Sequence, residues 1–412
     1  MERDFFKKNL DKLKKDIKDG EMYILSSGKE ITFSCDTTYR FRANKNFYYY
    51  LGYNFDDVTY VLLKSDNKLK QFIFFDEVSP DRVRWIGSKL TKDKVKVNQG
   101  LKDDEIFEAG MLVVTLEKEI ASGKIKDVYL SISKDVDDMS YRDNWLRREL
   151  DNSKVLFKDI DEISSKHRPY KEKEELEAIK KAISITEKAF KMVARNIKKC
   201  KTENEAEAWL DYEVRKEGVR FNGFEPIVAS GMNGTTLHYE ENNSKIEKGS
   251  LVLFDIGYEW DGYSSDVSRT IPQSGHFSKE QREIYEIVLN TNKKVAEQVR
   301  PGMTFKELND IAIKYLSLGL FNLGKIKSDE ELKEYYFHSV SHPLGLDAHD
   351  LRPNTKVIEE GMVITDEPGL YIKELGIGIR IEDDLLITKD GAIVLTDKIP
   401  KEIDELEELI NH

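Results

Sequence analysis

The segment Ser250–Ile271, SLVLFDIGYEWDGYSSDVSRTI, constrains the fold of this chain more than any other stretch. An apolar run leads into Asp255, the dipeptide Asp261-Gly262 follows, and the chain then returns through Asp266. An Asp-Gly pair between two such runs is a strong indicator of a β-hairpin with a tight turn. The segment therefore predicts two antiparallel strands, each carrying one aspartate.

A hairpin centred on this dipeptide fixes the relation between the two aspartates. It places Asp255 opposite Ser268, and Asp266, two residues before Ser268, shares its face of the sheet. The carboxylates are then diagonal neighbours, and a metal ion fits between them. A carboxylate that ends a run of Leu, Val, Leu and Phe is costly unless it is paired or metal-bound. The alternative, two solvated aspartates near a turn, is left open by this segment alone.

Length and charge narrow the class of protein. A chain of 412 residues exceeds one ordinary core, so two domains are expected. Hydrophobic residues make up 39% and charged residues 34%, which is typical of a globular chain. The net charge of −12, with both signs mixed along the chain, argues against nucleic acid as a partner, because phosphate contacts need clustered Lys and Arg.

The cysteines and the N-terminus indicate a compartment. Cys35 and Cys200 are far apart and in no CxxC spacing, so neither a disulfide scaffold nor a cysteine zinc site is expected. The N-terminus reads as a charged amphipathic helix rather than a signal peptide. No apolar stretch is long enough to span a membrane. We therefore expect a cytoplasmic protein without a membrane partner.

The first part of the chain alternates strand and helix patterns. The apolar runs Thr59–Leu63, Gln71–Phe75 and Val128–Ser131 predict strands, and Asp81–Leu90 and Asp104–Glu119 predict helices. This alternation indicates a small α/β domain. We place the domain boundary near residue 160, giving domains 1–160 and 161–412.

The second part separates helices from strands. Lys171–Ile197 carries apolar residues at steps of three, four or seven, which predicts a helix with one buried face. Three more helices are predicted from capping boxes. These boxes are Thr202 with Glu205, Ser278 with Gln281, and Thr304 with Glu307. Segments rich in strands and glycine turns lie between and after them, so the fold class of this domain is α+β.

A histidine-containing loop supplies further candidate ligands. The sequence Ser341–Asp350 reads SHPLGLDAHD, and its proline and glycine argue against a continuous helix, so His342 and His349 are expected on a shaped loop. His238 and His338 lie close to the candidate segments in the sequence. Neutral imidazole is the commonest metal ligand and a ready acid–base group. For any one of these histidines alone, a structural role is the alternative.

Two short motifs add carboxylates. In Asp366–Tyr371, DEPGLY, Glu367 precedes a Pro-Gly turn, and a glutamate in that position alone is usually just exposed. In Ile377–Asp384, IGIRIEDD, alternation places the isoleucines on one face and Arg380 and Glu382 on the other. Glu382 is then either a structural ion pair with Arg380 or a metal ligand supported by that arginine.

Together the candidate metal ligands form an oxygen-rich set. They are Asp255, Asp266, His342, Glu367 and Glu382. Such a hard site suits Mn²⁺ best, with Co²⁺, Zn²⁺ and Fe²⁺ as alternatives. Four anionic ligands balance two divalent ions, and carboxylates bridge them, which is the two-metal arrangement of hydrolases.

The order and spacing of FDIG…SSDVSRT, SHPLGLDAHD, DEPGLY and GIRIEDD resemble the creatinase, aminopeptidase P and prolidase group of pita-bread enzymes. The resemblance runs from about Lys171 to Pro400, and YRFRANKNFYYYLGYNFDDVTYVLL resembles the N-terminal domain of aminopeptidase P. It implies a pita-bread catalytic domain behind a smaller creatinase-type α/β domain. It also implies hydrolysis of the Xaa-Pro bond at a peptide's N-terminus, and a dimer or tetramer.

The resemblance also assigns roles to the candidate ligands. Asp255 would bind one metal, and Asp266 would bridge both. His342 and Glu367 would bind the other metal, and Glu382 would bridge. Glu367 would further act as general base.

Four other residues receive roles outside the metal shell. His238, in LHYE, would contact substrate, and His338 would line the pocket. His349 would stabilise the developing oxyanion, and Arg380 would hold the bridging carboxylates. Pro343 stands where relatives carry varied residues, which leaves that wall of the pocket undefined.

Three alternative functions stay open. A prolidase would cleave only the dipeptide, because it needs a free carboxylate after proline. A creatinase-like amidinohydrolase uses this fold without metal, and a non-catalytic binding module would typically have lost ligands, whereas all five are present here.

Trp85, in RVRWIGSKL, either helps shape a neighbouring subunit's pocket or belongs to the core.

Overall fold

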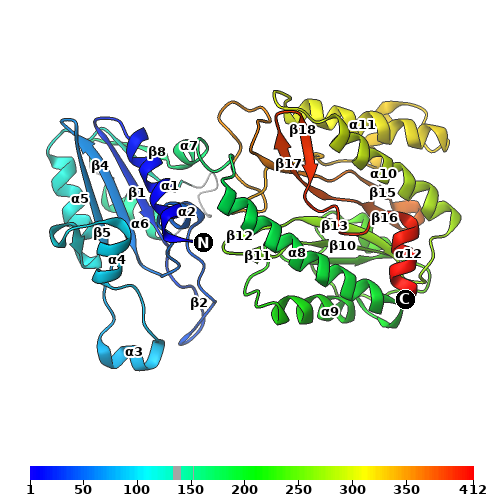
Figure 1. The fold of residues 1–412 in the computed structure, drawn as a ribbon, viewed down its shortest axis with the longest axis horizontal. Coiled ribbons are helices and arrows are strands. Elements are labelled where there is room, and N and C mark those ends of the chain that lie inside the picture. The colour runs from blue at the N-terminus through cyan, green and yellow to red at the C-terminus, as the bar shows by residue number, and fades with distance from the viewer. Residues whose placement is uncertain (133–140, 152) are drawn as a thin grey trace. The chain divides into compact units, whose positions relative to one another are not determined.

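The computed structural model describes residues 1–132, 141–151 and 153–412. The chain divides into two compact units, Met1–His167 and Arg168–His412 (Figure 1). The division falls a few residues after the boundary expected near residue 160.

The N-terminal unit is built on a six-stranded sheet of order β6-β5-β4-β1-β7-β8. Its strands are β1 (Glu21–Ser26), β4 (Thr59–Ser65), β5 (Lys68–Phe74), β6 (Ile106–Phe107), β7 (Asp127–Leu130) and β8 (Leu156–Asp159). Its helices are α1 (Arg3–Asp16), α2 (Lys45–Leu51), α3 (Pro80–Ile86), α4 (Lys92–Gln99), α5 (Leu112–Ala121), α6 (Tyr141–Glu149) and α7 (Asp161–Ser164). A small hairpin, β2 (Thr32–Ser34) and β3 (Thr37–Thr38), completes the unit. Mixed strand order with helices in the connections confirms the predicted α/β class.

One predicted helix of this unit is wrong over its first half. The segment Asp104–Glu119 is not one helix, because Ile106 and Phe107 form β6 and pair in parallel with the end of β5. Ile106 is buried by this pairing. The helix α5 therefore begins only at Leu112.

The C-terminal unit contains two three-stranded sheets, β13-β10-β9 and β14-β17-β18, and two short hairpins. The strands are β9 (Ile227–Ser230), β10 (Leu251–Ile256), β11 (Glu259–Trp260), β12 (Tyr263–Ser264), β13 (Val267–Pro272), β14 (Val363–Asp366), β15 (Gly369–Ile372), β16 (Ile377–Arg380), β17 (Asp383–Thr388) and β18 (Gly391–Val394). The helices are α8 (Lys173–Asn196), α9 (Glu203–Lys216), α10 (Lys279–Gln298), α11 (Phe305–Asn322) and α12 (Ile403–Asn411). Antiparallel pairing and separate helices confirm the α+β class.

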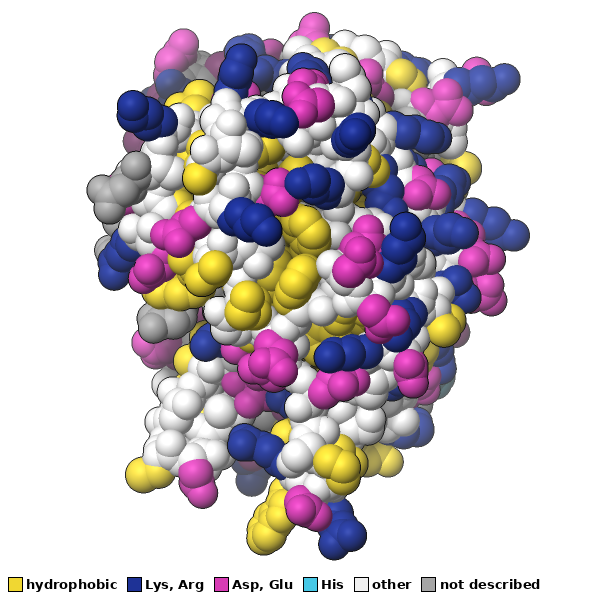
Figure 2. Space-filling view, turned by 90° about the vertical axis from the view of Figure 1, so that its left-hand side faces the viewer, with side chains coloured by type: hydrophobic (Ala, Val, Ile, Leu, Met, Phe, Trp, Pro, Cys, Tyr) yellow, Lys and Arg dark blue, Asp and Glu magenta, His cyan; other side chains and the backbone are white. Residues whose placement is uncertain are grey.

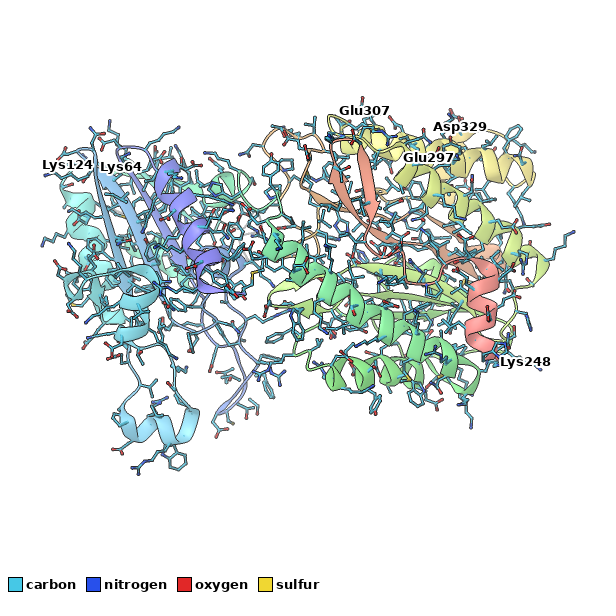
Figure 3. All side chains as sticks on the ribbon, in the orientation of Figure 1. Lys64, Lys124, Lys248, Glu297, Glu307 and Asp329 are labelled. Carbon is cyan, nitrogen blue, oxygen red and sulfur yellow. The ribbon has the colours of Figure 1, made fainter. Side chains whose placement is uncertain are left out.

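The helix starts of this unit follow the predicted caps. Ser278 and Thr304 form complete capping boxes with Gln281 and Glu307, and Glu307 lies at the start of α11 (Figure 3). Thr202 caps α9, but the carboxylate of Glu205 accepts the N–H of Lys201 instead of the N–H of Thr202. A capped first turn satisfies N–H groups that the helix itself leaves without partners.

The two parts of the sheet system meet beside Ser268. The N–H of Glu382 donates to the carbonyl of Ser268 at 3.0 Å. The hydroxyl of Thr270 bonds the backbone of Arg380, as acceptor from its N–H and as donor to its C=O, at 3.2 Å each. β16 thus lies against β10 and β13. This junction brings the DVSRT and GIRIED motifs together, although more than a hundred residues separate them in the sequence.

Surface charges are mixed on the face of the N-terminal unit shown in Figure 2. Lys and Arg side chains alternate there with Asp and Glu side chains instead of gathering by sign. Among the described residues, no helix combines the length and the apolar character needed to cross a membrane.

Candidate metal centre

The hairpin predicted from the sequence forms with the predicted register. Asp255 pairs with Ser268 in β10–β13, and Trp260 pairs with Tyr263 at the turn. The turn residues Asp261 and Gly262 have φ of 48° and 87°, the left-handed values that an Asp-Gly hairpin turn requires.

All nine predicted site residues line one cavity of about 790 Å³ in the C-terminal unit. They are Asp255, Asp266, His342, Glu367, Glu382, His238, His338, His349 and Arg380. They come from β10, from the residues before β13, from the 341–350 loop, from the β14–β17 region, and, for His238 and His338, from the segments before β10 and before that loop. Apolar side chains, Phe224, Ile227 and Leu237, form part of the wall. Apolar lining with convergent polar groups is the usual character of a ligand site.

Three of the predicted ligands form a compact group. Asp266, His342 and Glu382 each offer a ligand atom within 4.8 Å of the others. Glu367 adjoins this group, because its Oε1 lies 3.5 Å from His342 Nε2. Asp255 lies beyond it, and its Oδ1 is buried without a hydrogen-bond partner among the described residues. A buried carboxylate oxygen left in this way has room for a cation.

The carboxylates of the cavity destabilise one another's charged forms. Burial raises the pKa of Asp266 well above its ordinary value, and the neighbouring carboxylates of Glu382 and Asp255 add to the effect. Burial also raises the pKa of Glu382 to about 8, with Asp255 as the next cause. The pKa of Glu367 rises for the same reasons, burial first and Glu382 second. Divalent cations would remove this repulsion, so the residues present fit a metal site.

His342 presents the correct nitrogen to such a site. Its Nδ1 lies 3.0 Å from the carbonyl of Pro343, which can only accept, so Nδ1 carries the proton. Nε2 is then a free lone pair, 3.6 Å from Asp266 Oδ2. Burial, with a smaller contribution from His349, lowers the pKa of His342 to about 4, so the ring is neutral. A neutral imidazole oriented by a carbonyl is the usual form of a metal-binding histidine.

Arg380 links several of these groups. Its Nη2 donates to Asp255 Oδ2 at 2.5 Å, and its Nε donates to Ser268 Oγ at 2.7 Å. Ser268 Oγ in turn donates to Glu382 Oε2 at 2.8 Å. Among the described residues, Ser268 therefore links Arg380 to the carboxylate of Glu382 by hydrogen bonds. Ser268 was not among the predicted site residues, although its pairing with Asp255 follows from the hairpin register.

Tyr371 extends this series of hydrogen bonds from Arg380 to His338. Arg380 Nη1 donates to the Tyr371 hydroxyl at 3.0 Å, and that hydroxyl lies 2.9 Å from His338 Nε2. His338 Nδ1 donates to the carbonyl of Ser339 at 2.9 Å, so Nε2 is the acceptor and Tyr371 the donor. Burial, followed by the charge of Arg380, lowers the pKa of His338 to about 4. Tyr371 was also missed by sequence reasoning, although it closes the DEPGLY motif.

Further charged residues beside the cavity pair with one another and bind the backbone of two predicted ligands. Arg269 Nη1 donates to the carbonyl of Glu382 at 2.6 Å, and its Nη2 pairs with Asp383 Oδ1 at 2.7 Å. Lys401 Nζ binds the other oxygen of Asp383 at 2.5 Å. Asp384 accepts the N–H of Asp266 at 3.3 Å. The backbone on both sides of the cavity is thereby fixed by buried ion pairs, which sequence pattern alone does not reveal.

The remaining histidines lie nearer to solvent. The ring centroids of His342 and His349 are 4.2 Å apart in an edge-to-face arrangement. His349 and His238 are both exposed and both line the cavity. Burial and then the nearby His238 lower the pKa of His349. Two imidazoles at an open cavity are available to a bound substrate.

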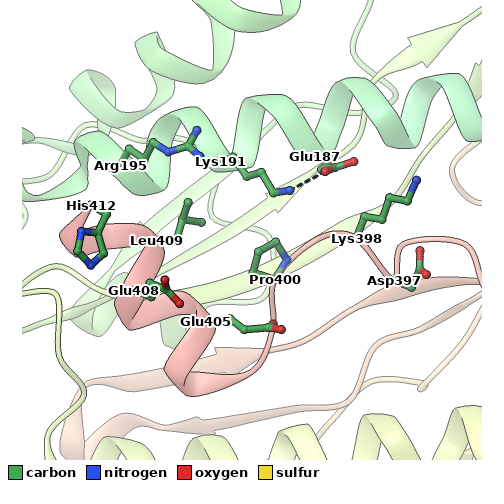
Figure 4. A pocket seen from close by; sticks show the side chains of 10 residues that line it. All are labelled: Glu187, Lys191, Arg195, Asp397, Lys398, Pro400, Glu405, Glu408, Leu409 and His412. Carbon is green, nitrogen blue, oxygen red and sulfur yellow. Dashed lines mark hydrogen bonds and ion pairs between the residues drawn. The ribbon is translucent and has the colours of Figure 1, made fainter.

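Another cleft, of about 600 Å³, lies between α8 and α12 (Figure 4). Charged side chains of both signs line it, and Lys191 is paired with Glu187 at 2.6 Å. None of the nine predicted site residues, all of which the structure describes, lines this cleft. The candidate chemistry is therefore confined to the first cavity.

Known proteins share both units. Residues 177–389 match Metallopeptidase family M24, and residues 6–129 match the aminopeptidase P N-terminal domain. The Xaa-Pro aminopeptidase of Escherichia coli is 31% identical over 437 residues, covering 100% of this chain and 98% of the relative. That of Haemophilus influenzae is 33% identical over 91% of this chain and 90% of the relative.

Structural similarity agrees with these matches. A histidine-to-alanine variant of Escherichia coli aminopeptidase P superposes with a TM-score of 0.89 at 29% identity, covering 100% of this chain and 98% of the other. The Xaa-Pro dipeptidase of Pyrococcus furiosus is 40% identical, but the alignment covers only 58% of this chain and 66% of the relative. The chain belongs to metallopeptidase family M24, with a pita-bread catalytic domain preceded by an aminopeptidase P-type N-terminal domain.

Proposed function

We propose that this chain is a metal-dependent Xaa-Pro aminopeptidase, which releases the N-terminal residue of a peptide whose second residue is proline. The observation that carries the proposal is the cavity that gathers four carboxylates and His342 in a family M24 domain. The Xaa-Pro aminopeptidases among the relatives match along nearly the whole chain, including the N-terminal unit.

The proposed cofactors are two divalent metal ions. The ligands would be Asp255, Asp266, His342, Glu367 and Glu382, with Asp266 and Glu382 shared between the ions. This oxygen-rich set favours Mn²⁺, and Co²⁺, Zn²⁺ and Fe²⁺ are the alternatives. When bound, the ions supply a water of lowered pKa and polarise the substrate carbonyl.

The protein's own residues perform the remaining steps. Glu367 would accept a proton from the attacking water and return it to the proline nitrogen as that nitrogen leaves. His349 would donate a hydrogen bond to the oxygen on which negative charge develops. His238 and His338 would contact and orient the peptide. Arg380 would keep Asp255, and through Ser268 also Glu382, in place for the metal ions.

Prolidase is the nearest alternative, since it shares the ligand set. The two activities differ in the group on the C-terminal side of proline, because a prolidase requires the free carboxylate of a dipeptide. The test compares an Xaa-Pro dipeptide with an Xaa-Pro-Xaa tripeptide, first with a chelator and then with added Mn²⁺. Cleavage of the tripeptide that is lost with chelator and restored by Mn²⁺ supports the proposal, whereas cleavage of the dipeptide alone identifies a prolidase.

Two alternatives of other classes are separated by metal content. A creatinase-like amidinohydrolase and a non-catalytic binding module would both lack a need for the complete ligand set. We expect the purified protein to bind two divalent ions and to lose peptidase activity when they are removed. An absence of metal-dependent cleavage for either peptide would reject the peptidase proposal and favour these classes.

Assembly and location are part of the same proposal. Trp85 is 87% exposed, so the interpretation of this residue as core is wrong. We propose that it contacts a neighbouring subunit in a homodimer or homotetramer, and that the protein works in the cytoplasm. Light scattering of the wild type and of Trp85→Ala tests the assembly, and an unchanged oligomer in the variant would reject the role of this side chain.

A further inference from the structure

Glu203 is a buried carboxylate outside the cavity. It is the first residue of α9, and its side chain is 0% exposed. It does not line the cavity of about 790 Å³ that contains the nine predicted site residues, hereafter the metal-ligand cavity. A glutamate is rarely buried to this degree unless several donors satisfy its oxygens.

One oxygen of Glu203 binds the end of β9 and the turn that follows it. Oε1 accepts the N–H of Ser230 at 2.7 Å and the hydroxyl of Ser230 at 2.8 Å. It also accepts Asn233 Nδ2 at 3.0 Å. Asn233 belongs to the 3₁₀ turn Gly231–Thr235.

The other oxygen binds the far end of the same segment. Oε2 accepts the hydroxyl of Tyr239 at 2.8 Å and the N–H of Ser244 at 2.9 Å. The N–H of Glu203 itself donates to the carbonyl of Ser244 at 3.0 Å. One side chain therefore ties together both ends of the segment 230–244, and the N-terminus of α9 adds a favourable field for its negative charge.

This segment carries three residues that line the cavity, Leu237, His238 and Glu240. Next to them, Tyr239 packs against the apolar cluster that contains Tyr371. Tyr371 is the residue that bonds Arg380 and His338. His238 is itself exposed, and the residue beside it, Tyr239, is held by Glu203.

We propose that Glu203 is a positioning residue that holds the segment 230–244, and with it His238, at the metal-ligand cavity. Its effect on catalysis rests on the proposed peptidase function, whereas its effect on the segment does not. Glu203 touches none of the predicted metal ligands, so metal binding should not depend on it.

Glutamine cannot take over this role, although it has the same shape. Each oxygen of Glu203 accepts a backbone N–H, from Ser230 on one side and from Ser244 on the other. A backbone N–H cannot reorient into an acceptor. Whichever way a glutamine amide is turned, its NH₂ group would face one of these donors. Glu203→Gln therefore keeps the shape of the side chain but places a donor where an acceptor is needed, which weakens the link between the two ends of the segment 230–244.

The first experiment is a double-mutant cycle on Xaa-Pro-Xaa hydrolysis. Glu203→Gln should lower kcat/KM by about 10- to 100-fold, the loss that misplacement of a substrate-contacting group produces. Adding Glu203→Gln to His238→Ala should lower kcat/KM by no more than about twofold further, because both changes remove the same interaction. Bound metal, measured by elemental analysis, should equal that of the wild type.

A matched control comes from the same helix. Glu205 is exposed, and its carboxylate accepts the neighbouring N–H of Lys201. Glu205→Ala should leave kcat/KM within about twofold of the wild type. Wild-type kinetics in Glu203→Gln, loss of metal from that variant, or additive losses in the cycle would overturn the proposal.

A second measurement does not depend on activity. Hydrogen exchange of peptides covering residues 231–244 should be faster in Glu203→Gln than in the wild type and unchanged in Glu205→Ala. Unchanged exchange in Glu203→Gln would overturn the positioning role even if the enzyme is active. If the wild type cleaves no proline peptide, the peptidase proposal fails, and the exchange experiment still decides the role of Glu203.

Discussion

At the scale of single residues, the positions of protons decide which atoms of the cavity can bind a metal ion. His342 donates from Nδ1 to the Pro343 carbonyl and so keeps Nε2 free. Glu382 is a stronger base than an ordinary glutamate, because burial and Asp255 raise its pKa to about 8. In the absence of a cation, the site would therefore hold protons near neutral pH in place of metal charge.

The raised pKa of Glu382 predicts how the metal affinity of the site depends on pH. A cation binds the ionised carboxylate, so binding below the raised pKa of Glu382 must release a proton. The apparent affinity for Mn²⁺ should rise with pH until about 8 and then level off. Calorimetric titrations of apo-protein with Mn²⁺, in buffers of different ionisation enthalpy, measure both the affinity and the proton release. An affinity independent of pH across this range would contradict the prediction.

The effect of replacing Ser268, which lies between Arg380 and Glu382, on metal affinity and activity can be predicted. Ser268→Ala removes the donor to Glu382 and the acceptor for Arg380 Nε without touching a metal directly. Loss of such an outer partner costs about 10- to 100-fold in metal affinity or activity. Peptidase assays at limiting and saturating Mn²⁺ separate these two effects. Ser250→Ala, whose hydroxyl donates to the nearby Glu247 carbonyl, serves as control and should match the wild type.

The ligand assignment itself is tested at Asp266. Asp266→Asn keeps the shape but removes a charge that two cations would share. We expect bound metal and activity to be lost together, measured by elemental analysis and tripeptide hydrolysis on the same sample. Turnover retained in this variant would refute the assignment of Asp266.

At the scale of elements, the strand β16 depends on a glycine contact. A Cβ added to Gly378 would meet the carbonyl oxygen of Gly234 at 1.7 Å. The strand that carries Arg380 therefore packs directly on the 3₁₀ turn of the segment 230–244. Glycine is required here by close approach of two backbones, not by an unusual φ.

This contact predicts a large effect for a small substitution. Gly378→Ala should lower the free energy of unfolding by about 1–3 kcal/mol, because the strand must move away from the turn. Activity should fall as well, since Arg380 lies two residues further along. Gly110 has no atom within 4 Å of an added Cβ, so Gly110→Ala should change stability by less than about 0.5 kcal/mol. Urea denaturation of both variants makes the comparison, and equal stability of the two would contradict it.

At the scale of the whole molecule, all nine predicted site residues belong to the unit Arg168–His412. A ligand stabilises the part of a protein that it binds, by about 2.7 kcal/mol at a hundredfold excess over Kd. Added Mn²⁺ should therefore slow hydrogen exchange mainly in peptides from residues 168–412. Slowing of equal size throughout residues 1–132 would contradict this assignment of the metal to one unit.

The predicted ligands show how far sequence reasoning reaches. The Asp-Gly turn fixes a register, and that register places Asp255 opposite Ser268 without any tertiary information. Alternation likewise predicts Arg380 and Glu382 on the face opposite the isoleucines, although β16 ends at Arg380, before Glu382. The long helix α8 follows from apolar spacing alone. These features depend on local geometry, whose period is fixed by the backbone.

Where prediction failed, a distant segment decided the outcome. Helical spacing alone could not show that Ile106 and Phe107 pair with β5 and form the edge strand of the sheet. The composition around Trp85 could not show that this side chain is exposed, because exposure depends on what else covers it. Asp383 and Lys401 are close in sequence, but their partner Arg269 lies more than a hundred residues away.

The family, the two-unit organisation and the set of candidate ligands could be inferred from the sequence, because motif order, turn chemistry and apolar spacing are properties of short stretches of chain. The groups that support those ligands depend instead on how distant segments pack together. The links from Arg380 through Ser268 to Glu382, from Tyr371 to His338, and from Glu203 to both ends of the segment 230–244 each join separate elements. Such links arise when burial forces every polar group to find a partner, and the partner is whatever packing has brought within about 3 Å.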